Sequence, residues 1–190
     1  MKLAAIEGNT QRLDGGAMFG NAPRAVWSKW VEVDEQNRIS LAARALLVGF
    51  DDGLKVLFET GIGAFFPPKL RARFGVNETE HLLLKNLGEQ GLSHEDIDCV
   101  VLSHLHFDHA GGLLTPWQEG EESQLLFPNA RYIVSTEHWQ RALQPHPRDR
   151  ASFIDTLSKL LIDSQRLELV DSDQQSILDG RARVHFSNGH

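Results

Sequence analysis

A short apolar run that ends directly in metal-ligating side chains constrains the fold more than any other part of this chain. Residues 97–103 are almost continuously apolar, which is typical of a β-strand buried on both faces. The next six residues contain His104, His106, Asp108 and His109. This order predicts a buried strand that is followed at once by four polar side chains able to bind a metal.

The spacing of these four side chains predicts a metal site. In an extended segment residues i and i+2 point the same way, so His104 and His106 can converge on one ion. If the chain then turns into a helix, Asp108 and His109 aim at a neighbouring point, which suits two ions about 3.5–4 Å apart. Imidazole and carboxylate ligands favour Zn(II), with Fe, Mn, Co or Ni as alternatives. The expected chemistry is metal-assisted hydrolysis; a solvated histidine-rich loop is the alternative, and its position after a buried strand disfavours it.

The remaining patterns predict a single mixed α/β domain over residues 1–190. Residues 9–25 are expected to form a loop. Strands are expected at 26–33, 39–50, 54–58, 131–135, 167–170 and 182–186, and helices at 136–143 and 151–163. A further helix is expected after a capping box of Asn77 and Glu80. Strands outnumber helices and hairpins join the early ones, so we expect a layered mixed fold and not a Rossmann fold.

Composition narrows the partners and the compartment. The formal net charge is −7 and no basic run is present, which argues against a nucleic-acid partner. Cys99 is the single cysteine, so no intramolecular disulfide is possible, and its apolar neighbours predict a buried thiol. No segment has the apolar length of a membrane span, and the first residues lack the apolar stretch of a signal peptide. We therefore expect a soluble cytoplasmic protein without a membrane partner.

Several segments together resemble the metallo-β-lactamase superfamily of metallohydrolases. The His-x-His-x-Asp-His segment with its flanking Ser103 and glycines carries the resemblance, and residues 56–63, 93–98 and 184–190 agree with it. Residues 14–20 and 27–29 look like the branch of quorum-quenching N-acyl-homoserine lactonases and organophosphate hydrolases. Nearby, Met18, Phe19, Trp27 and Trp30 either line an apolar substrate pocket or pack in the core.

The resemblance implies an αββα sandwich of mixed sheets with two divalent ions, most simply Zn(II), at one edge. It implies that His104, His106 and His190 bind the first ion, and that Asp108 and His109 bind the second. Asp108 would also be catalytic, because it would hydrogen-bond the hydroxide that bridges the ions. The implied substrate is a small lactone or ester of the N-acyl-homoserine lactone type.

Two departures from the family pattern affect these expectations. Glu59 stands where the family usually has Asp, which puts the support around the metals in doubt. The family continues beyond the position of His190 with a bridging Asp and a final His, so we expect a chain that lacks the C-terminal part of the second half. Such a chain would bind metal weakly, unless another copy completes it in a homodimer.

Other functions remain open at this stage. Organophosphate, thioester and β-lactam hydrolysis share the expected fold. A diiron oxidoreductase is disfavoured, because that branch generally has Glu at the position of His106. A catalytically incomplete fragment or a partner protein is a third class. The other histidines, at positions 81, 94, 138, 146 and 185, are expected to be surface or packing residues.

Overall fold

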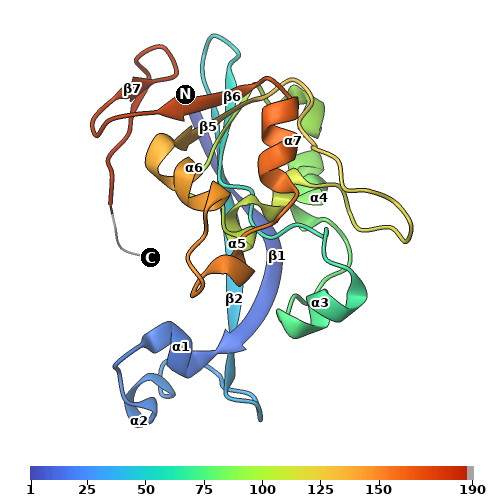
Figure 1. Ribbon diagram of the computed structural model, residues 1–190, viewed down its shortest axis with the longest axis vertical. Coiled ribbons are helices and arrows are strands. Elements are labelled where there is room, and N and C mark those ends of the chain that lie inside the picture. Colours follow the sequence, from blue (N-terminus) through green and yellow to red (C-terminus); the bar gives the residue numbers. More distant parts are fainter. Residues whose placement is uncertain (188–190) are drawn as a thin grey trace.

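A computed structural model describes residues 1–187 and has a mixed α/β architecture (Figure 1). Its central sheet has six strands in the order β1-β2-β3-β4-β5-β6, and β7 and β8 form a small separate pair. β1, β2 and β3 pair antiparallel, whereas β3 to β6 pair parallel. The strands are β1 Lys2–Asp14, β2 Arg38–Gly49, β3 Lys55–Phe58, β4 Cys99–Val101, β5 Arg131–Ser135, β6 Leu167–Val170, β7 Ser176–Ile177 and β8 Ala182–Arg183. The expected mixed sheet is therefore confirmed.

Short helices connect these strands, and several lie where the periodicity predicted them. The α-helices are α1 Gly15–Phe19, α2 Arg24–Trp27, α3 Pro68–Arg73, α4 Leu82–Glu89, α5 Phe107–Ala110, α6 Thr136–Leu143 and α7 Leu157–Asp163. The 3-10 turns are η1 His94–Asp96, η2 Gly111–Leu113 and η3 Arg150–Ser152. Within residues 1–187 none of the helices has both the length and the apolar character needed to cross a membrane.

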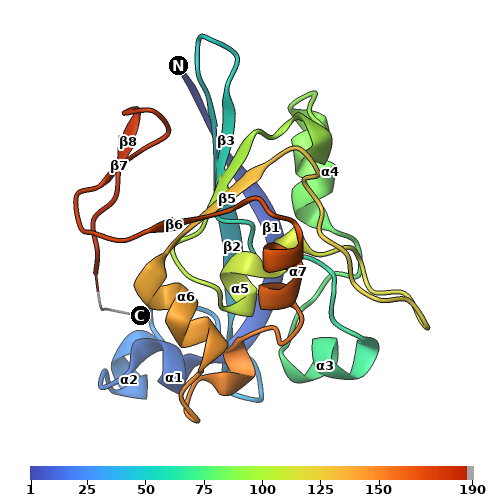
Figure 2. The ribbon, with the colours of Figure 1, turned by 45° about the horizontal axis from the view of Figure 1, so that its top comes forward.

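The two faces of the central sheet are covered differently. Helices α4, α6 and α7 cover one face, where Leu87, Trp139 and Leu161 pack into the main core. The β7–β8 pair covers part of the other face, where Ile177 packs in a second cluster with Cys99. Figure 2 shows this pair and helices α4 and α7 on opposite sides of the sheet. The thiol of Cys99 is buried, as expected, and burial raises its pKa to about 12.

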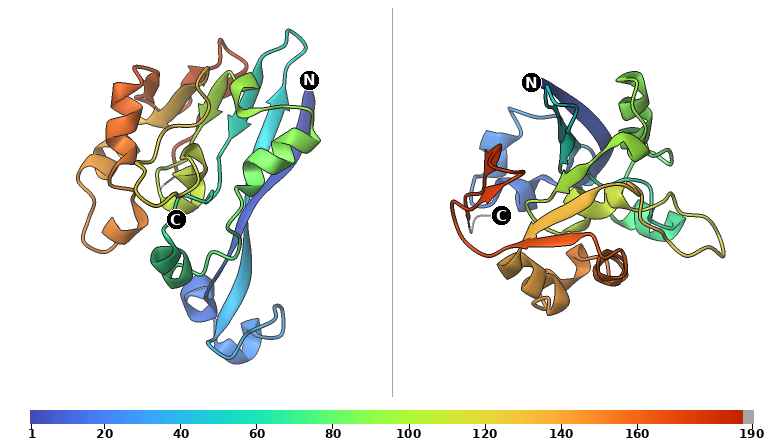
Figure 3. Two further views of the ribbon diagram at one scale, coloured as in Figure 1. Left: turned by 90° about the vertical axis from the view of Figure 1, so that its right-hand side faces the viewer. Right: turned by 90° about the horizontal axis from the view of Figure 1, so that it is seen from above.

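The N-terminal strand corrects the expected loop at residues 9–25. β1 extends to Asp14, and its register against β2 shifts between Glu7 and Thr10. This irregularity places Gly8 and Asn9 inside a strand, although their types are typical of loops. The far parts of β1 and β2 extend beyond the rest of the sheet and carry α1 and α2 at their tip (Figures 1 and 3). β1 is the edge strand of the sheet and its burial does not alternate regularly along its length, so its residues carry little strand signal.

The expected strand at residues 26–33 is also wrong. Its first residues belong to α2, which follows Pro23, and turns follow it. Trp27 is 1% exposed and stacks on Phe19 with 5.1 Å between ring centroids. A Cβ on Gly15 would lie 2.4 Å from the Trp27 ring, so the ring fills the space above that glycine. Tertiary packing of one large ring therefore overrides the β propensity of this segment.

The N-terminus of α4 is capped by a residue other than the expected Asn77. His81 is the N-cap, and its Nδ1 accepts a hydrogen bond from the Leu84 N–H at 3.5 Å. Its Nε2 lies 3.1 Å from the Gly112 carbonyl oxygen, to which it donates. Asn77 instead donates to the Thr10 hydroxyl. His81 therefore ties α4 to the turn that follows the predicted metal ligands.

The burial of His81 predicts a loss of stability in acid. His81 is 4% exposed, and burial lowers its pKa to about 4 from the usual value near 6.5. The unfolded chain therefore takes up a proton between these values before the folded chain does. Stability from the neutral ring is fully present above about pH 6.5 and is lost as pH falls toward 4, by roughly 2–3 kcal/mol.

Urea unfolding of metal-free protein at pH 7.5 and 4.5 measures this effect. The His81→Gln variant should lose less unfolding free energy between the two pH values than the wild type does, by about 2 kcal/mol. Equal losses in both proteins would show that His81 does not contribute to the acid sensitivity.

Candidate metal centre

The four predicted ligands lie where the parallel strands end. β4 ends at Val101, residues 104–106 continue in extended backbone, and α5 begins at Phe107. Ligand atoms of His104, His106 and Asp108 lie within 4.8 Å of one another. The ring of His109 lies 4.0 Å from that of His104, centroid to centroid. The structure thus brings together all four side chains that the spacing predicted, while His190 lies outside the described residues.

This donor set fits a divalent cation. It combines imidazole nitrogens with one carboxylate, a combination that Zn(II) and its neighbours in the transition series prefer. Ligands that share an ion through bonds of about 2.0–2.2 Å lie a little over 3 Å apart, so small side-chain rotations would close the group. Asp108 lies with the first two histidines in this group, and the described residues do not divide into two separate ligand pairs.

Glu59 provides a direct contact to the cluster. It follows β3 with a positive φ of 65°, and its Oε1 accepts a hydrogen bond from the Ser103 N–H at 2.7 Å. Its Oε2 accepts a second hydrogen bond from Nδ1 of His109 at 3.0 Å. The longer Glu side chain therefore still reaches the ligand segment.

The carboxylates around His109 affect the pKa of its ring. Burial acts to lower the pKa of His109, but the hydrogen bond and charge of Glu59, with the charge of Asp108, raise it above its usual value. Asp108 lies 3.5 Å from Nε2 of His109. Because Nδ1 of His109 donates its hydrogen bond to Glu59, Nε2 is the nitrogen that would bind a metal.

Two glycines allow the ligand helix to pack directly on the segment after β3. The Thr60 N–H and hydroxyl both donate to the His109 carbonyl oxygen, at 2.9 and 2.8 Å. A Cβ on Gly111 would lie 2.2 Å from the Ile62 carbonyl oxygen, and one on Gly112 would lie 2.1 Å from that of Thr60. The backbone of residues 111–112 therefore packs directly against the backbone of residues 60–62, and this contact determines how closely α5 packs against the sheet.

His138 is a neighbour of the cluster that the sequence placed among surface or packing residues. Its Nε2 accepts a hydrogen bond from the Leu105 N–H, between the first two ligands, at 2.8 Å. Burial lowers the pKa of His138 to about 4, so the ring is neutral and can accept this bond at physiological pH. The order of the elements could have indicated that His138 lies near the ligands, because α6 begins where β5 ends, at the same edge of the sheet.

The aromatic residues near α1 and α2 divide between the two roles considered for them. Trp27 packs in the interior, whereas Met18 is 46% exposed and Trp30 is 64% exposed. Phe19 contacts both tryptophan rings. Core packing is therefore confirmed for Trp27, while a substrate contact by the exposed pair stays a prediction.

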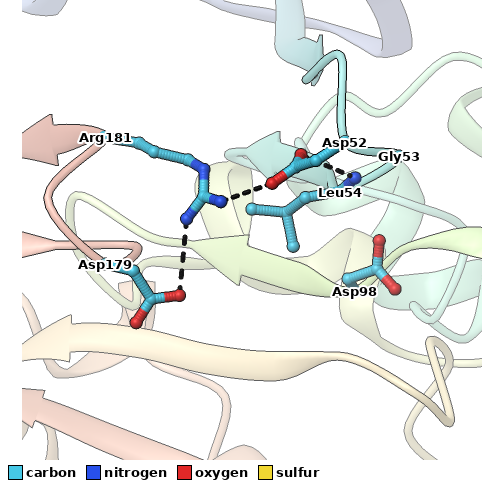
Figure 4. A pocket seen from close by; sticks show the side chains of 6 residues that line it. All are labelled: Asp52, Gly53, Leu54, Asp98, Asp179 and Arg181. Atoms are coloured by element: carbon cyan, nitrogen blue, oxygen red, sulfur yellow. Dashed lines mark hydrogen bonds and ion pairs between the residues drawn. The ribbon is translucent and has the colours of Figure 1, made fainter.

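A surface pocket at the opposite edge of the sheet is separate from the metal cluster. It is lined by Asp52, Gly53, Leu54, Asp98, Asp179 and Arg181 (Figure 4). Leu54 and Asp98 directly precede the region of β3 and β4, so the pocket lies near the amino ends of these strands. Arg181 pairs with Asp52 and Asp179 there and fastens the β7–β8 pair to the β2–β3 turn. These ion pairs give Arg181, Asp52 and Asp179 a structural role in joining the two segments.

Comparison with known proteins places this geometry among metallohydrolases. The family model described as "Metallo-beta-lactamase superfamily" matches residues 41–190. A probable metal-dependent hydrolase from Staphylococcus aureus has a similar structure, with 30% identity, a TM-score of 0.79, and coverage of 93% of this chain and 61% of the other. The chain thus spans about three-fifths of the length of that solved structure.

Two more distant structures share the fold. AidC, a dizinc quorum-quenching lactonase in complex with a product, is 24% identical with a TM-score of 0.63, and the match covers 93% of this chain and 59% of AidC. An N-acyl homoserine lactone hydrolase with N-hexanoyl-L-homoserine bound at its catalytic metal centre is 19% identical with a TM-score of 0.61, covering 93% and 62%. At these identities the likeness concerns the fold alone.

Proposed function

Because the chain belongs to the metallo-β-lactamase superfamily, we propose that it acts in metal-dependent hydrolysis, with a lactone or a related ester as the substrate. The observation that carries this proposal is the convergence of His104, His106 and Asp108 at the carboxyl edge of the parallel strands, with His109 beside them. No comparable group of metal ligands was predicted elsewhere in the sequence.

Each of these residues has a distinct part in the proposed centre. His104 and His106 would hold one divalent ion, Zn(II) by preference, and Asp108 with His109 would hold a second. His190 remains a proposed further ligand. When bound, such ions acidify water and polarise the carbonyl group of an ester.

The surrounding residues orient the ligands through hydrogen bonds to their ring nitrogens. Ser103 Oγ lies 2.9 Å from Nδ1 of His104, which leaves Nε2 as the nitrogen that would face the ion. Glu59 orients His109 in the same way through Nδ1. Asp108 is half-buried beside both, and its carboxylate can accept a hydrogen bond from the water that attacks the ester carbonyl.

Support for a lactone comes from two directions. Residues 14–20 and 27–29 resemble the lactonase and organophosphate-hydrolase branch, and they lie around α1 and α2, where Met18 and Trp30 present exposed apolar side chains. Two solved structures with the same fold are named as lactone hydrolases. An acyl chain would find apolar surface on these side chains.

A substrate panel tests the proposal on the Zn(II)-loaded protein. We expect the rate of ring opening of N-hexanoyl-homoserine lactone to exceed the rates of hydrolysis of an aryl phosphotriester, a thioester and a β-lactam. Lactone opening is measured by the one proton that each turnover releases. Faster phosphotriester cleavage would move the assignment to organophosphate hydrolysis. A metal-loaded protein that hydrolyses none of the four would indicate a non-catalytic partner.

A further inference from the structure

An acidic side chain outside the predicted motif lies beside the candidate metal centre. Asp149 belongs to the loop between α6 and η3, more than forty positions after His106 in the chain. Its Oδ2 lies 3.9 Å from Nε2 of His106. No motif in the sequence marks Asp149, so its place beside a predicted ligand is a product of the fold.

Arg141 holds the carboxylate in this position. Its Nε and Nη2 both donate to Oδ2 of Asp149, at 2.9 and 2.6 Å. The Asp149 side chain is 19% exposed, against 51% for Arg141, so the arginine reaches the carboxylate from the solvent side. Burial acts to raise the pKa of Asp149, but the hydrogen bonds and charge of Arg141 lower it overall. The two hydrogen bonds from one guanidinium therefore fix the orientation of the carboxylate.

One oxygen of the Asp149 carboxylate can still accept a hydrogen bond. Oδ1 of Asp149 is buried, and none of the residues 1–187 donates a hydrogen bond to it. Leaving a buried carboxylate oxygen without a donor is costly, so a nearby donor would stabilise it. His106 is a further ionisable neighbour of this carboxylate, with its Nε2 lying 3.9 Å from Oδ2, the oxygen that Arg141 also contacts.

The ring of His106 is confined by its neighbours. Phe153 meets it edge to face, with 4.7 Å between centroids, and the backbones of these two residues form an isolated antiparallel bridge. His138 binds the preceding backbone N–H. Nε2 is the ring nitrogen that lies 3.9 Å from Asp149, so a hydrogen bond at that atom would make Nδ1 the nitrogen that binds a metal.

We propose that Asp149, anchored by Arg141, is a positioning residue that accepts the Nε2 proton of His106 and so directs Nδ1 toward the metal. This inference rests on the proposed function. Metal-bound histidines commonly donate their second ring N–H to a carboxylate, which fixes the tautomer and strengthens the ligand. Asp149 is not itself a ligand, because its Oδ2 already receives two guanidinium donors and it lies outside the close group of His104, His106 and Asp108.

The Asp149→Asn variant tests this role with little change of shape. Asparagine keeps an oxygen for Arg141 but removes the negative charge that faces His106. We expect Zn(II) affinity, measured by competition with a chromophoric chelator, to fall about 10- to 100-fold. In the NMR spectrum of the Co(II)-loaded protein, the hyperfine-shifted N–H signal of His106 should shift, or should broaden because the proton exchanges faster with water. A purely structural role would leave that signal in place.

Two further variants separate the possible outcomes. Glu168→Gln is the matched control, because Glu168 forms an exposed ion pair with Arg131 at 2.9 Å away from the cluster, and it should bind Zn(II) as the wild type does. Arg141→Met leaves the carboxylate but removes its anchor, and should weaken binding in the same direction by a smaller factor. If Asp149→Asn failed to fold, Arg141→Met would still carry the test.

The results that contradict the inference are distinct from failure of the proposed function. Unchanged affinity and an unchanged Co(II) signal in Asp149→Asn and Arg141→Met, with a wild type that binds metal, would overturn the role of Asp149 alone. An altered Co(II) ligand-field spectrum with loss of binding beyond about 1,000-fold would make Asp149 a direct ligand and overturn the positioning role. A wild type that binds no metal would overturn the proposed function and this role together.

Discussion

Replacing His106 with alanine is expected to remove metal binding and to reduce turnover by several orders of magnitude. His106 belongs to the group whose ligand atoms lie within 4.8 Å, and its ring is 4.6 Å from that of His104. Removing it leaves two members of that group and opens the coordination shell on the side of Asp149. Elemental analysis of the purified protein and the rate of lactone hydrolysis measure both effects.

The control for this variant is His94→Ala. His94 lies on η1, just before β4, at the opposite end of the strand from the cluster. It should retain wild-type metal content and turnover, which separates the loss of a ligand from the loss of any histidine. Circular dichroism of both variants establishes that they fold. A His106→Ala protein with normal metal content and normal turnover would refute its assignment as a ligand.

Replacing Gly112 with alanine is expected to destabilise the fold by about 3 kcal/mol and to displace the ligand helix. The added Cβ would lie 2.1 Å from the Thr60 carbonyl oxygen, and that atom belongs to backbone that cannot rotate away. Thr60 also holds the His109 carbonyl, so any shift that relieves the clash moves a predicted ligand. Thermal unfolding of metal-free protein measures the first effect, and Zn(II) affinity measures the second.

Gly88 provides the matched control for this substitution. It lies in α4, where an added Cβ would meet no atom within 4 Å. Gly88→Ala should therefore leave stability unchanged or raise it by about 0.5–1 kcal/mol, since alanine favours a helix. If Gly112→Ala unfolded at the wild-type temperature and bound metal normally, the close contact of the two backbone segments would not be essential.

The candidate site could be predicted to the extent that its geometry is local. Two histidines separated by one residue in extended backbone share a direction, and a helix immediately afterwards brings the next two side chains nearby. These relations hold within a six-residue segment, so no knowledge of distant contacts was needed to group His104, His106, Asp108 and His109. The mixed sheet was likewise predicted from strands whose apolar runs reflect burial, such as residues 97–103.

The errors arose where a segment's conformation depends on distant partners. β1 is stabilised by pairing with β2 across an irregular register, and its own residues do not alternate clearly. The segment at 26–33 has strand-forming residue types, but Trp27 gains more by burying its ring against Gly15 and Phe19. The helix cap at His81 depends on the Gly112 carbonyl, thirty-one positions away.

The sequence by itself determined which atoms can bind a metal and that they emerge together from a buried strand, because ligand chemistry and neighbouring backbone directions are properties of adjacent residues. Only the tertiary structure decided what holds those atoms in place. Glu59 reaches the ligand segment from the end of β3, His138 from α6 and Asp149 from the loop after α6, all of them outside that segment. Their contacts require the parallel strands to end at one edge and the two glycines to admit close packing, and neither condition can be evaluated from residues 104–109 alone.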